Sequence, residues 1–415
     1  MAGPVIVFED QHVDDLYPMS LTRPVSDLRC GILSLSHKAG LVLGAAPRYH
    51  VRDYLAPLTK GAVTSYGDLL KDGGTALLVN GRALLNPGTA RAIEHGARAA
   101  YVAGGTVAAA VIGSEDAGRF DDAIGCPLDT ALFSDLPARE IEAAFIGHPW
   151  DLVSSNGAQI ESDWGLLGLS GIASDIPDGV WLVNEALISI GKGVKLAPGV
   201  VLDASGGPIH IADGVTIMAN SSLMGPLHIG EGTVIKMGAR IYGETSIGPA
   251  CRIGGEVAET IIHGYSNKQH DGFLGHSYLG EWVNLGAGTD TSDLKNNYST
   301  VKVRVHDETV DTGEMFVGLY MGDHSKCGIG TTFNTGTVAG ACCNIFGAGY
   351  PPKFIPSFTW GGGAGFEEYD PARALETAAR AMRRRGVDPG PEVEAVLKRV
   401  YEITSDSREA FIKGA

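Results

Sequence analysis

The clearest pattern in this chain is an aliphatic residue at every sixth position through its middle part. Eight such positions follow one another without a break: Ile211, Ile217, Leu223, Ile229, Ile235, Ile241, Ile247 and Ile253. A helix repeats a face every 3.6 residues and a strand every two, so neither element places all eight side chains on one side. A three-sided parallel β-coil does, because each side takes one hexad and glycine allows the chain to turn the corners. The pattern therefore predicts hexapeptide repeats with the aliphatic side chains inside.

The same spacing extends in both directions. Upstream it includes Ile190, Leu196 and Leu202, and extra residues around Pro208 reset the phase. Downstream the spacing returns at Met321, Cys327, Phe333, Ala339 and Ile345. We therefore expect the coil to occupy residues 181–350.

Residues 290–316 interrupt the hexads. Within them, three valines alternate with three polar residues: Val301, Lys302, Val303, Arg304, Val305 and His306. A period of two followed by turn residues at 311–313 is typical of a strand. This segment is predicted to leave the coil as an excursion with one exposed strand, and such excursions commonly build binding sites.

The two flanks of the coil differ from it and from each other. Residues 1–140 contain short apolar runs at 4–8 and 76–79 and two further strand candidates around a Gly-Gly turn in 101–112, which predicts an α/β domain. Residues 141–180 are interpreted as a linker. In residues 351–415, Asp370 and Pro371 begin a helix that ends near Gly386, and a second helix is expected over 391–401. We expect these helices to cover the open end of the coil.

Composition restricts the partners of the protein. The 415 residues have a net charge of −16, which argues against binding to nucleic acid or to an anionic membrane. No apolar run approaches the ~18 residues that span a bilayer, and the acidic beginning differs from a signal peptide. We therefore expect a cytoplasmic protein. The six cysteines show no metal-binding spacing, so reduced thiols in the core are expected and no metal site is predicted.

Four motifs carry a resemblance to a known family. They lie at residues 21–35, 254–298, 321–338 and 354–362, and the second of them is long and specific. With them the chain resembles the GlmU-like family of bifunctional uridylyltransferase and glucosamine-1-phosphate acetyltransferase enzymes, in its divergent bacterial branch of sugar nucleotidyltransferases. The resemblance implies a degenerate nucleotidyltransferase-like Rossmann-type domain, a left-handed parallel β-helix, a C-terminal helical segment and a homotrimer with active sites between neighbouring coils.

The resemblance also implies an acetyltransferase site. His270, in the stretch 267–273, matches the family's general base, and Asn284 and Ala287 match its Val-Asn-Ile-Gly-Ala-Gly-Thr element. A neutral imidazole accepts a proton near neutral pH, as the attack of an amine on acetyl-CoA requires. Asn284 would orient the substrate, and a backbone N–H near Ala287 would hold acetyl-CoA or the developing oxyanion, with Lys302 as a further cofactor contact.

The residues expected to bind the substrate depart from the family. Tyr242 replaces a phosphate-binding arginine, Ala258 replaces a lysine, and Phe273 replaces a tyrosine near the sugar. A sugar phosphate still needs cations. The candidates for this role are Arg240, Lys268, Lys295 and Lys302. The acceptor is expected to be an amino-sugar phosphate or a nucleotide-linked amino sugar, and the sequence does not identify which one.

The N-terminal domain departs further. Nucleotidyltransferases hold phosphates with a glycine-rich loop, whereas residues 8–24 contain no glycine and four acidic side chains. Asn80 stands near the position of the family's metal-binding aspartate. Arg23, Lys38 and Asn80 remain as candidate nucleotide contacts, and Mg²⁺ is expected only if this domain is active.

Three alternatives stay open. The first is nucleotidyl transfer onto a sugar-1-phosphate by the N-terminal domain, and the second is a non-catalytic trimeric scaffold or regulator. The third is a zinc site like that of hexapeptide-coil carbonic anhydrases, although the histidine spacing does not reproduce that family's pattern. The histidines concerned are His263, His270, His276 and His324.

Overall fold

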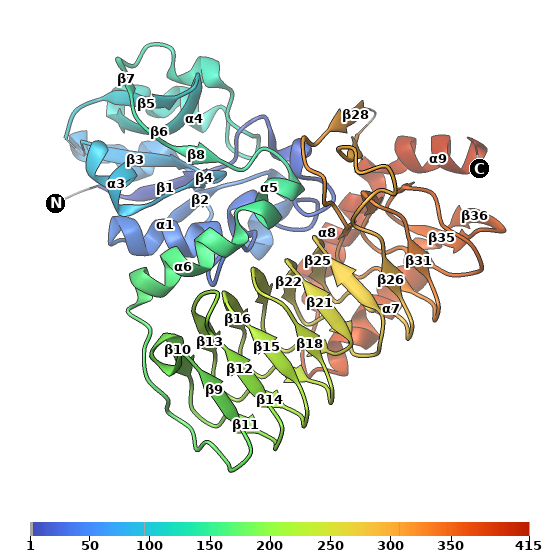
Figure 1. The fold of residues 1–415 in the computed structure, drawn as a ribbon. Helices are drawn as coiled ribbons and strands as arrows, with labels where there is room; N and C mark the ends of the chain where they lie inside the picture. The colour runs from blue at the N-terminus through green and yellow to red at the C-terminus, as the bar shows by residue number, and fades with distance from the viewer. Residues whose placement is uncertain (1–2, 95, 307, 415) are drawn as a thin grey trace.

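The computed structural model describes residues 3–94, 96–306 and 308–414. The described chain forms an α/β domain, a parallel β-solenoid and three C-terminal helices, in that order (Figure 1). None of the helices in these ranges is long and apolar enough to cross a membrane.

The N-terminal domain is built on a six-stranded sheet of order β2-β1-β3-β6-β5-β7. Its strands are β1 (Val5–Phe8), β2 (Arg48–His50), β3 (Thr75–Asn80), β5 (Ala99–Ala103), β6 (Thr106–Gly113) and β7 (Ala138–Glu140). All pairings are parallel except those of β6, which runs antiparallel to β3 and β5. The strands therefore agree with the apolar runs at 4–8 and 76–79 and with the two strands expected around the Gly-Gly turn.

Short helices cover this sheet and connect it to the solenoid. They are α1 (Leu35–Leu43), α2 (Tyr66–Leu70), α3 (Pro87–Ala92), α4 (Ala117–Asp121), α5 (Pro149–Ser154) and α6 (Asn156–Leu167), and a small hairpin joins β4 (Ala83–Leu84) to β8 (Ala144–Phe145). Helix α6 contacts α1 and also the solenoid strands β16 and β19. Helix α6, which lies within the segment 141–180 interpreted as a linker, therefore packs on both domains.

The solenoid has three faces of parallel strands. The first face contains β10 (Ile188–Ile190), β13 (Ile209–Ile211), β16 (Leu227–Ile229), β19 (Thr245–Ile247), β22 (Ile261–Gly264), β25 (Tyr278–Glu281), β29 (Leu319–Met321), β32 (Thr337–Ala339) and β34 (Phe354–Ile355). The second contains β11 (Lys195–Leu196), β14 (Thr216–Ile217), β17 (Val234–Ile235), β20 (Arg252–Ile253) and β23 (Asn267–Lys268), and continues in β30 (Lys326–Cys327), β33 (Asn344–Ile345) and β35 (Thr359–Gly362). The third contains β9 (Trp181–Val183), β12 (Val201–Asp203), β15 (Ser222–Met224), β18 (Arg240–Ile241), β21 (Glu256–Ala258) and β24 (Phe273–Gly275), followed by β26 (Asp290–Thr291) and β31 (Thr332–Phe333).

The register confirms the hexapeptide coil. Ile211, Ile229 and Ile247 lie opposite one another in successive strands, so one turn takes three hexads. All eight residues of the unbroken series are at most 1% exposed. The inward column also contains a charged residue, because Lys268 lies opposite Ile253 and is 2% exposed. The aliphatic core predicted from the spacing is therefore present, with one lysine inside it.

The excursion differs from its prediction. It forms an antiparallel hairpin of β27 (Lys302–Val305) and β28 (Glu308–Asp311). Val301, Val303 and Val305 are 0 to 7% exposed and belong to one apolar cluster with Val13, Leu16 and Met19 of the N-terminal domain. The strand Lys302–Val305 is therefore exposed on one face only. Lys302 and Arg304 are exposed as expected, whereas this chain's own N-terminal domain covers the valines.

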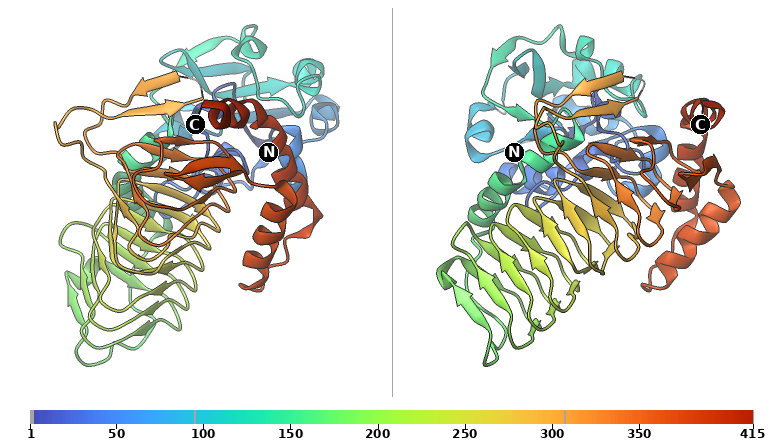
Figure 2. Two further views of the ribbon diagram at one scale, coloured as in Figure 1. Left: turned by 90° about the vertical axis from the view of Figure 1, so that its right-hand side faces the viewer. Right: turned by 45° about the vertical axis from the view of Figure 1, so that its right-hand side comes forward.

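The C-terminal helices are α7 (Pro371–Arg383), α8 (Gly390–Ile403) and α9 (Ser405–Gly414). As predicted, Asp370 caps α7 and accepts a hydrogen bond from the Arg373 N–H at 2.9 Å. Helices α7 and α8 run along the flank of the solenoid and do not cover its end (Figure 2), because the apolar residues of α8 pack on the N-terminal domain. The last turn is instead followed by the hairpin of β35 and β36 (Gly365–Glu368), where Phe366 packs against the coil core and contacts Phe411 of α9.

Candidate functional site

The residues matched to the acetyltransferase motif meet at one edge of the solenoid. His270 lies in the corner between β23 and β24, and its side chain is exposed. Ala287 occupies the same corner one turn further along, where the Gly288 N–H donates to the Asp271 carbonyl at 3.1 Å. Asn284 lies opposite Asn267, and the Asn267 Nδ2 donates to the Asn284 Oδ1 at 3.1 Å. Neighbouring turns of the coil thus bring the imidazole, the amide and the backbone of the motif together.

Lys268 lies beneath this corner. Its Nζ donates to the His270 carbonyl at 2.7 Å, which ties the turn that carries the imidazole to the inside of the coil. Burial lowers the pKa of Lys268 to about 8, although the nearby Asp290 and Asp271 oppose the shift. In this arrangement the ammonium group of Lys268 points into the coil. A contact between Lys268 and the substrate therefore stays a prediction.

The other predicted substrate residues are divided among three places. Arg240 and Phe273 lie on the outer side of the third face, where the Arg240 Nε is 3.3 Å from the Glu256 Oε2, and Tyr242 is exposed beside them. Lys295 lines a separate polar cavity of 530 Å³ together with Lys353 and Asn334. Lys302 lies exposed on the hairpin. Of these three places, the outer side of the third face adjoins the corner that carries His270. Arg240 is therefore the exposed cation nearest to His270 along the coil among the predicted substrate residues.

Apolar side chains flank the imidazole along the same edge. Met237 and Ile329 hold the equivalent corner position in other turns and are 69% and 81% exposed. The Gly330 N–H donates to the Ala287 carbonyl at 2.7 Å, which places Ile329 directly beyond Ala287. This exposed apolar edge is not evident from the sequence, because the hexad pattern identifies only the inward positions.

Two residues of the acidic segment in the N-terminal domain, Glu9 and Asp10, are paired with arginines inside that domain. Asp10 receives the guanidinium of Arg82, with Nη2 to Oδ2 at 2.6 Å and Nε to Oδ1 at 2.8 Å, and Asn80 Nδ2 donates to the same carboxylate at 2.8 Å. Glu9 is paired with Arg52 at 2.9 Å, and all four side chains of the two pairs are nearly buried. Burial alone would raise the pKa of Asp10, but the contacts with Arg82 outweigh it and hold the pKa below its ordinary value.

This arrangement does not suit the Mg²⁺ that a nucleotidyl transfer would use. The oxygens of Asp10 are taken up by Arg82 and Asn80, whereas Mg²⁺ requires carboxylate oxygens in its own coordination shell. Within the described residues, no three His, Cys, Asp or Glu side chains converge in a metal-binding arrangement, the four histidines of the zinc alternative included.

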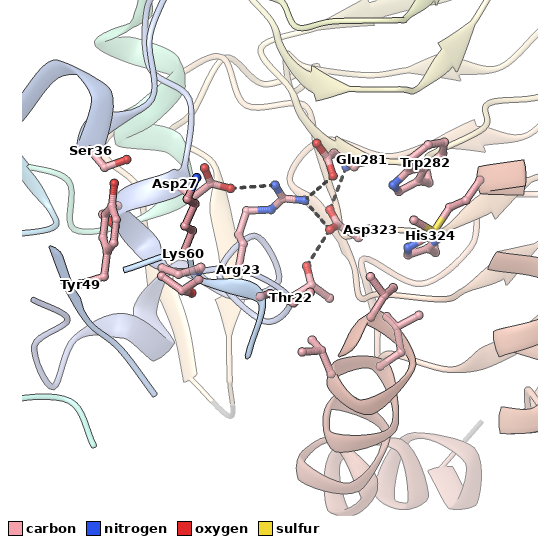
Figure 3. A pocket seen from close by; sticks show the side chains of 18 of the residues that line it. Thr22, Arg23, Asp27, Ser36, Tyr49, Lys60, Glu281, Trp282, Asp323 and His324 are labelled. Atoms are coloured by element: carbon pink, nitrogen blue, oxygen red, sulfur yellow. Dashed lines mark hydrogen bonds and ion pairs between the residues drawn. The ribbon is translucent and has the colours of Figure 1, made fainter. Parts of the chain in front are cut away.

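Arg23 connects the two domains. Its guanidinium contacts Asp323 and Glu281 of the solenoid as well as Asp27, and the Thr22 Oγ1 donates to Asp323 at 2.7 Å (Figure 3). These residues border a cavity of 410 Å³ between the N-terminal domain, the solenoid and helices α7 and α8. Trp282 and His324 form its solenoid wall. Sequence reasoning did not identify Glu281, Trp282 or Asp323, because the hexad pattern identifies inward positions and does not indicate which side chains at the corners form a site.

The remaining nucleotide candidates are also held inside the protein. Lys38 is 1% exposed, its Nζ lies 3.0 Å from the Asp163 Oδ1, and it also donates to Gln159 of α6. Asn80 is 2% exposed beside Asp10. The structure therefore does not bring Arg23, Lys38 and Asn80 to one surface, and their binding of a nucleotide stays a prediction.

Comparisons with known proteins agree with this organisation. Residues 5–170 match the sugar nucleotidyl transferase family. The chain is 32% identical to the bifunctional protein GlmU of Rippkaea orientalis over 171 residues, which cover 37% of this chain and 36% of that protein. It is 34% identical to a bifunctional sugar-1-phosphate nucleotidylyltransferase/acetyltransferase of Sulfurisphaera tokodaii over 91 residues, 22% of this chain and 23% of that one. The chain thus spans about a third or less of the length of these relatives.

Among solved structures, a UDP-N-acetylglucosamine acyltransferase is 16% identical, with a TM-score of 0.25 over 59% of this chain and 92% of that chain. The fold and the family match define a protein that joins a sugar nucleotidyl transferase domain to a parallel β-solenoid. Within that class the chain is similar to GlmU-type bifunctional proteins, as its motifs indicated.

Proposed function

We propose that this protein is a transferase whose solenoid moves an acetyl group from acetyl-CoA to the amine of an amino-sugar phosphate or a nucleotide-linked amino sugar, with His270 as the general base. The observation that carries the proposal is the exposed imidazole at the coil edge, with Asn284 and Ala287 on the adjacent turn. The similarity to bifunctional acetyltransferases supports the same activity.

The chemistry follows from the residues at this edge. The substrate amine attacks the thioester carbonyl and passes a proton to the neutral imidazole of His270 while the carbon–sulfur bond breaks. The thiolate of coenzyme A takes up a proton as it leaves. A backbone N–H near Ala287 stabilises the oxyanion of the tetrahedral intermediate, and Asn284 orients the acceptor. Arg240 supplies positive charge for the phosphate of the substrate.

We also propose a homotrimer in which a neighbouring coil completes the cleft. The support is the exposed apolar edge of Met237 and Ile329 on either side of His270, since apolar side chains gathered beside polar groups are typical of association surfaces. A neighbouring coil packed along this edge would shield the thioester from water and provide the long walls that coenzyme A requires.

The decisive experiment measures thiol release from acetyl-CoA with a panel of amino-sugar phosphates and nucleotide-linked amino sugars. We expect His270→Ala to lower kcat by about 10²- to 10⁴-fold, because proton transfer by a positioned base contributes that much. His12→Ala is the matched control, since that imidazole is exposed on the N-terminal domain. Unchanged thiol release in His270→Ala would contradict the assignment of the base.

A second candidate function is nucleotidyl transfer onto a sugar-1-phosphate, which the family match over residues 5–170 favours. It predicts magnesium-dependent release of pyrophosphate that falls in Arg23→Ala and is indifferent to His270→Ala. The buried pairing of Asp10 with Arg82 argues against this function in the described conformation. A scaffold or regulator would release neither thiol nor pyrophosphate.

A further inference from the structure

A second edge of the solenoid carries a cavity of 210 Å³ that the proposed acetyl transfer does not use. It lies between helix α5 and the corner that joins the third face to the first, whereas His270 lies in the corner between the second and third faces. Glu244, Glu259 and His276 occupy this corner in three successive turns, each with a positive φ, at 54°, 45° and 45°. The repeat therefore stacks three titratable side chains along one wall.

The charge of this wall is not balanced. His276 is held between two carboxylates, with its Nε2 2.6 Å from the Glu259 Oε2 and its Nδ1 2.8 Å from the Asp293 Oδ2. Glu244 and Glu314 also line the cavity, and neither forms an ion pair with another residue in the described ranges. None of the described residues that line it is a lysine or an arginine. Burial raises the pKa of Glu244, and the negative charge of Glu259 adds to the shift.

Aromatic rings form the rest of the wall. Trp150 and Tyr320 are buried, and the Phe316 ring stacks on His276 with centroids 5.0 Å apart and 20° between the planes. Tyr320 is 0% exposed, yet its hydroxyl has no hydrogen-bond partner among the described residues. A buried hydroxyl without a partner costs free energy, so an unsatisfied one beside a cavity indicates a ligand that supplies the partner.

We propose that this cavity binds the primary ammonium group of a small aliphatic amine. An ammonium has three N–H donors, which match the Tyr320 hydroxyl oxygen and two of the surrounding carboxylates. The aromatic walls attract a cation through the faces of their rings. A divalent metal ion is a poorer match, because no three His, Cys, Asp or Glu side chains in the described parts of the chain form a metal-binding arrangement.

The test is a calorimetric titration of the full-length protein with n-butylammonium. We expect saturable binding that weakens about tenfold or more in Glu244→Gln, in Glu314→Gln and in Tyr320→Phe, because each glutamine variant removes a negative charge beside the ammonium and Tyr320→Phe removes a hydrogen-bond acceptor. Glu231→Gln, at an exposed glutamate elsewhere on the coil, is the matched control and should bind as the unchanged protein does. Thermal unfolding of each variant confirms that it is folded.

Four outcomes would overturn the proposal. The first is the absence of saturable heat, and the second is unchanged affinity for n-butylammonium in Tyr320→Phe and in both glutamine variants. The third is equal affinity for tetramethylammonium, which has no N–H donor. The fourth is displacement of n-butylammonium by an equal concentration of Mg²⁺. Binding should persist in His270→Ala. The failure of this site and the failure of the acetyltransferase site are therefore distinguishable.

Discussion

The two domains of this protein bury charge in different ways. The N-terminal domain holds three ion pairs inside, Glu9 with Arg52, Asp10 with Arg82, and Lys38 with Asp163. The coil is filled with aliphatic side chains, and Lys268 is the charged residue in its inward column. A repeating fold must use the same kind of residue at each inward position, whereas an irregular domain can place a cation beside each buried carboxylate.

This difference bears on where chemistry can take place. Of the four acidic side chains in residues 8–24, Glu9 and Asp10 are occupied by internal arginines, and Arg23 is occupied by the solenoid. The coil instead presents unpaired polar side chains at its corners, of which His270 is one. The comparison favours the solenoid edge as the reactive part of the molecule. Four predictions test how the two domains differ in what they bury.

The largest effect is expected from breaking a buried pair. Asp10→Ala should lower the free energy of unfolding by about 3–5 kcal/mol, because it leaves the guanidinium of Arg82 buried without a counter-charge. Urea denaturation measures this loss. Replacing both partners, as Asp10→Leu with Arg82→Met, should recover most of it. A loss below about 1 kcal/mol in Asp10→Ala, similar to that in the exposed Asp15→Ala, would show that the pair is not buried in solution.

The coil core should respond to lost volume. Ile247→Ala is expected to cost about 2–5 kcal/mol, because the aliphatic column cannot collapse around the cavity that remains. Urea denaturation again provides the measurement, and Ser222→Ala, at an exposed position of the third face, is the control. Equal stabilities of the two variants would contradict the inward direction of the hexad residue.

Lys268 should make stability depend on pH in the alkaline range. Its pKa in the folded protein is about 8, below the usual value of about 10.4, so the unfolded chain holds more protons between these pH values and stability rises with pH there. The expected gain is on the order of 2 kcal/mol. In Lys268→Met this rise should disappear, which chemical denaturation at pH 7.5 and pH 10 would reveal. A rise of the same size in both proteins would assign it to other groups.

The smallest effect concerns His276. Burial alone would lower its pKa, but the bonds to Asp293 and Glu259 outweigh it and raise the pKa to about 9. The stability that this histidine contributes is therefore present below about pH 6.5 and is lost as pH rises through 9. Because Glu259 is partly exposed, we expect only about 1–2 kcal/mol, as the difference between the protein and His276→Gln at pH 6 and pH 9.5. A pH-independent difference would contradict the ion pairs.

The candidate site was predictable only in part. The resemblance placed His270, Asn284 and Ala287 in one motif, and they lie on neighbouring turns of the coil. The inward direction of Lys268 could not be read from the sixfold spacing, because that series ends at Ile253 and the turn from Ile253 to Lys268 is shorter than three hexads. The unsatisfied Tyr320 and the edge of Met237 and Ile329 could not be inferred, since they depend on which faces of the coil remain uncovered.

By itself, the sequence determined the parallel coil, its aliphatic core and the beginning of the helix at Pro371. These features are local or periodic, and a side chain's direction follows from its position in the repeat. Only the tertiary structure decided that the hairpin valines are buried, that Arg23 joins the two domains and that α7 and α8 lie along the flank. Those outcomes depend on contacts between segments far apart in the chain, and no spacing within either segment records them.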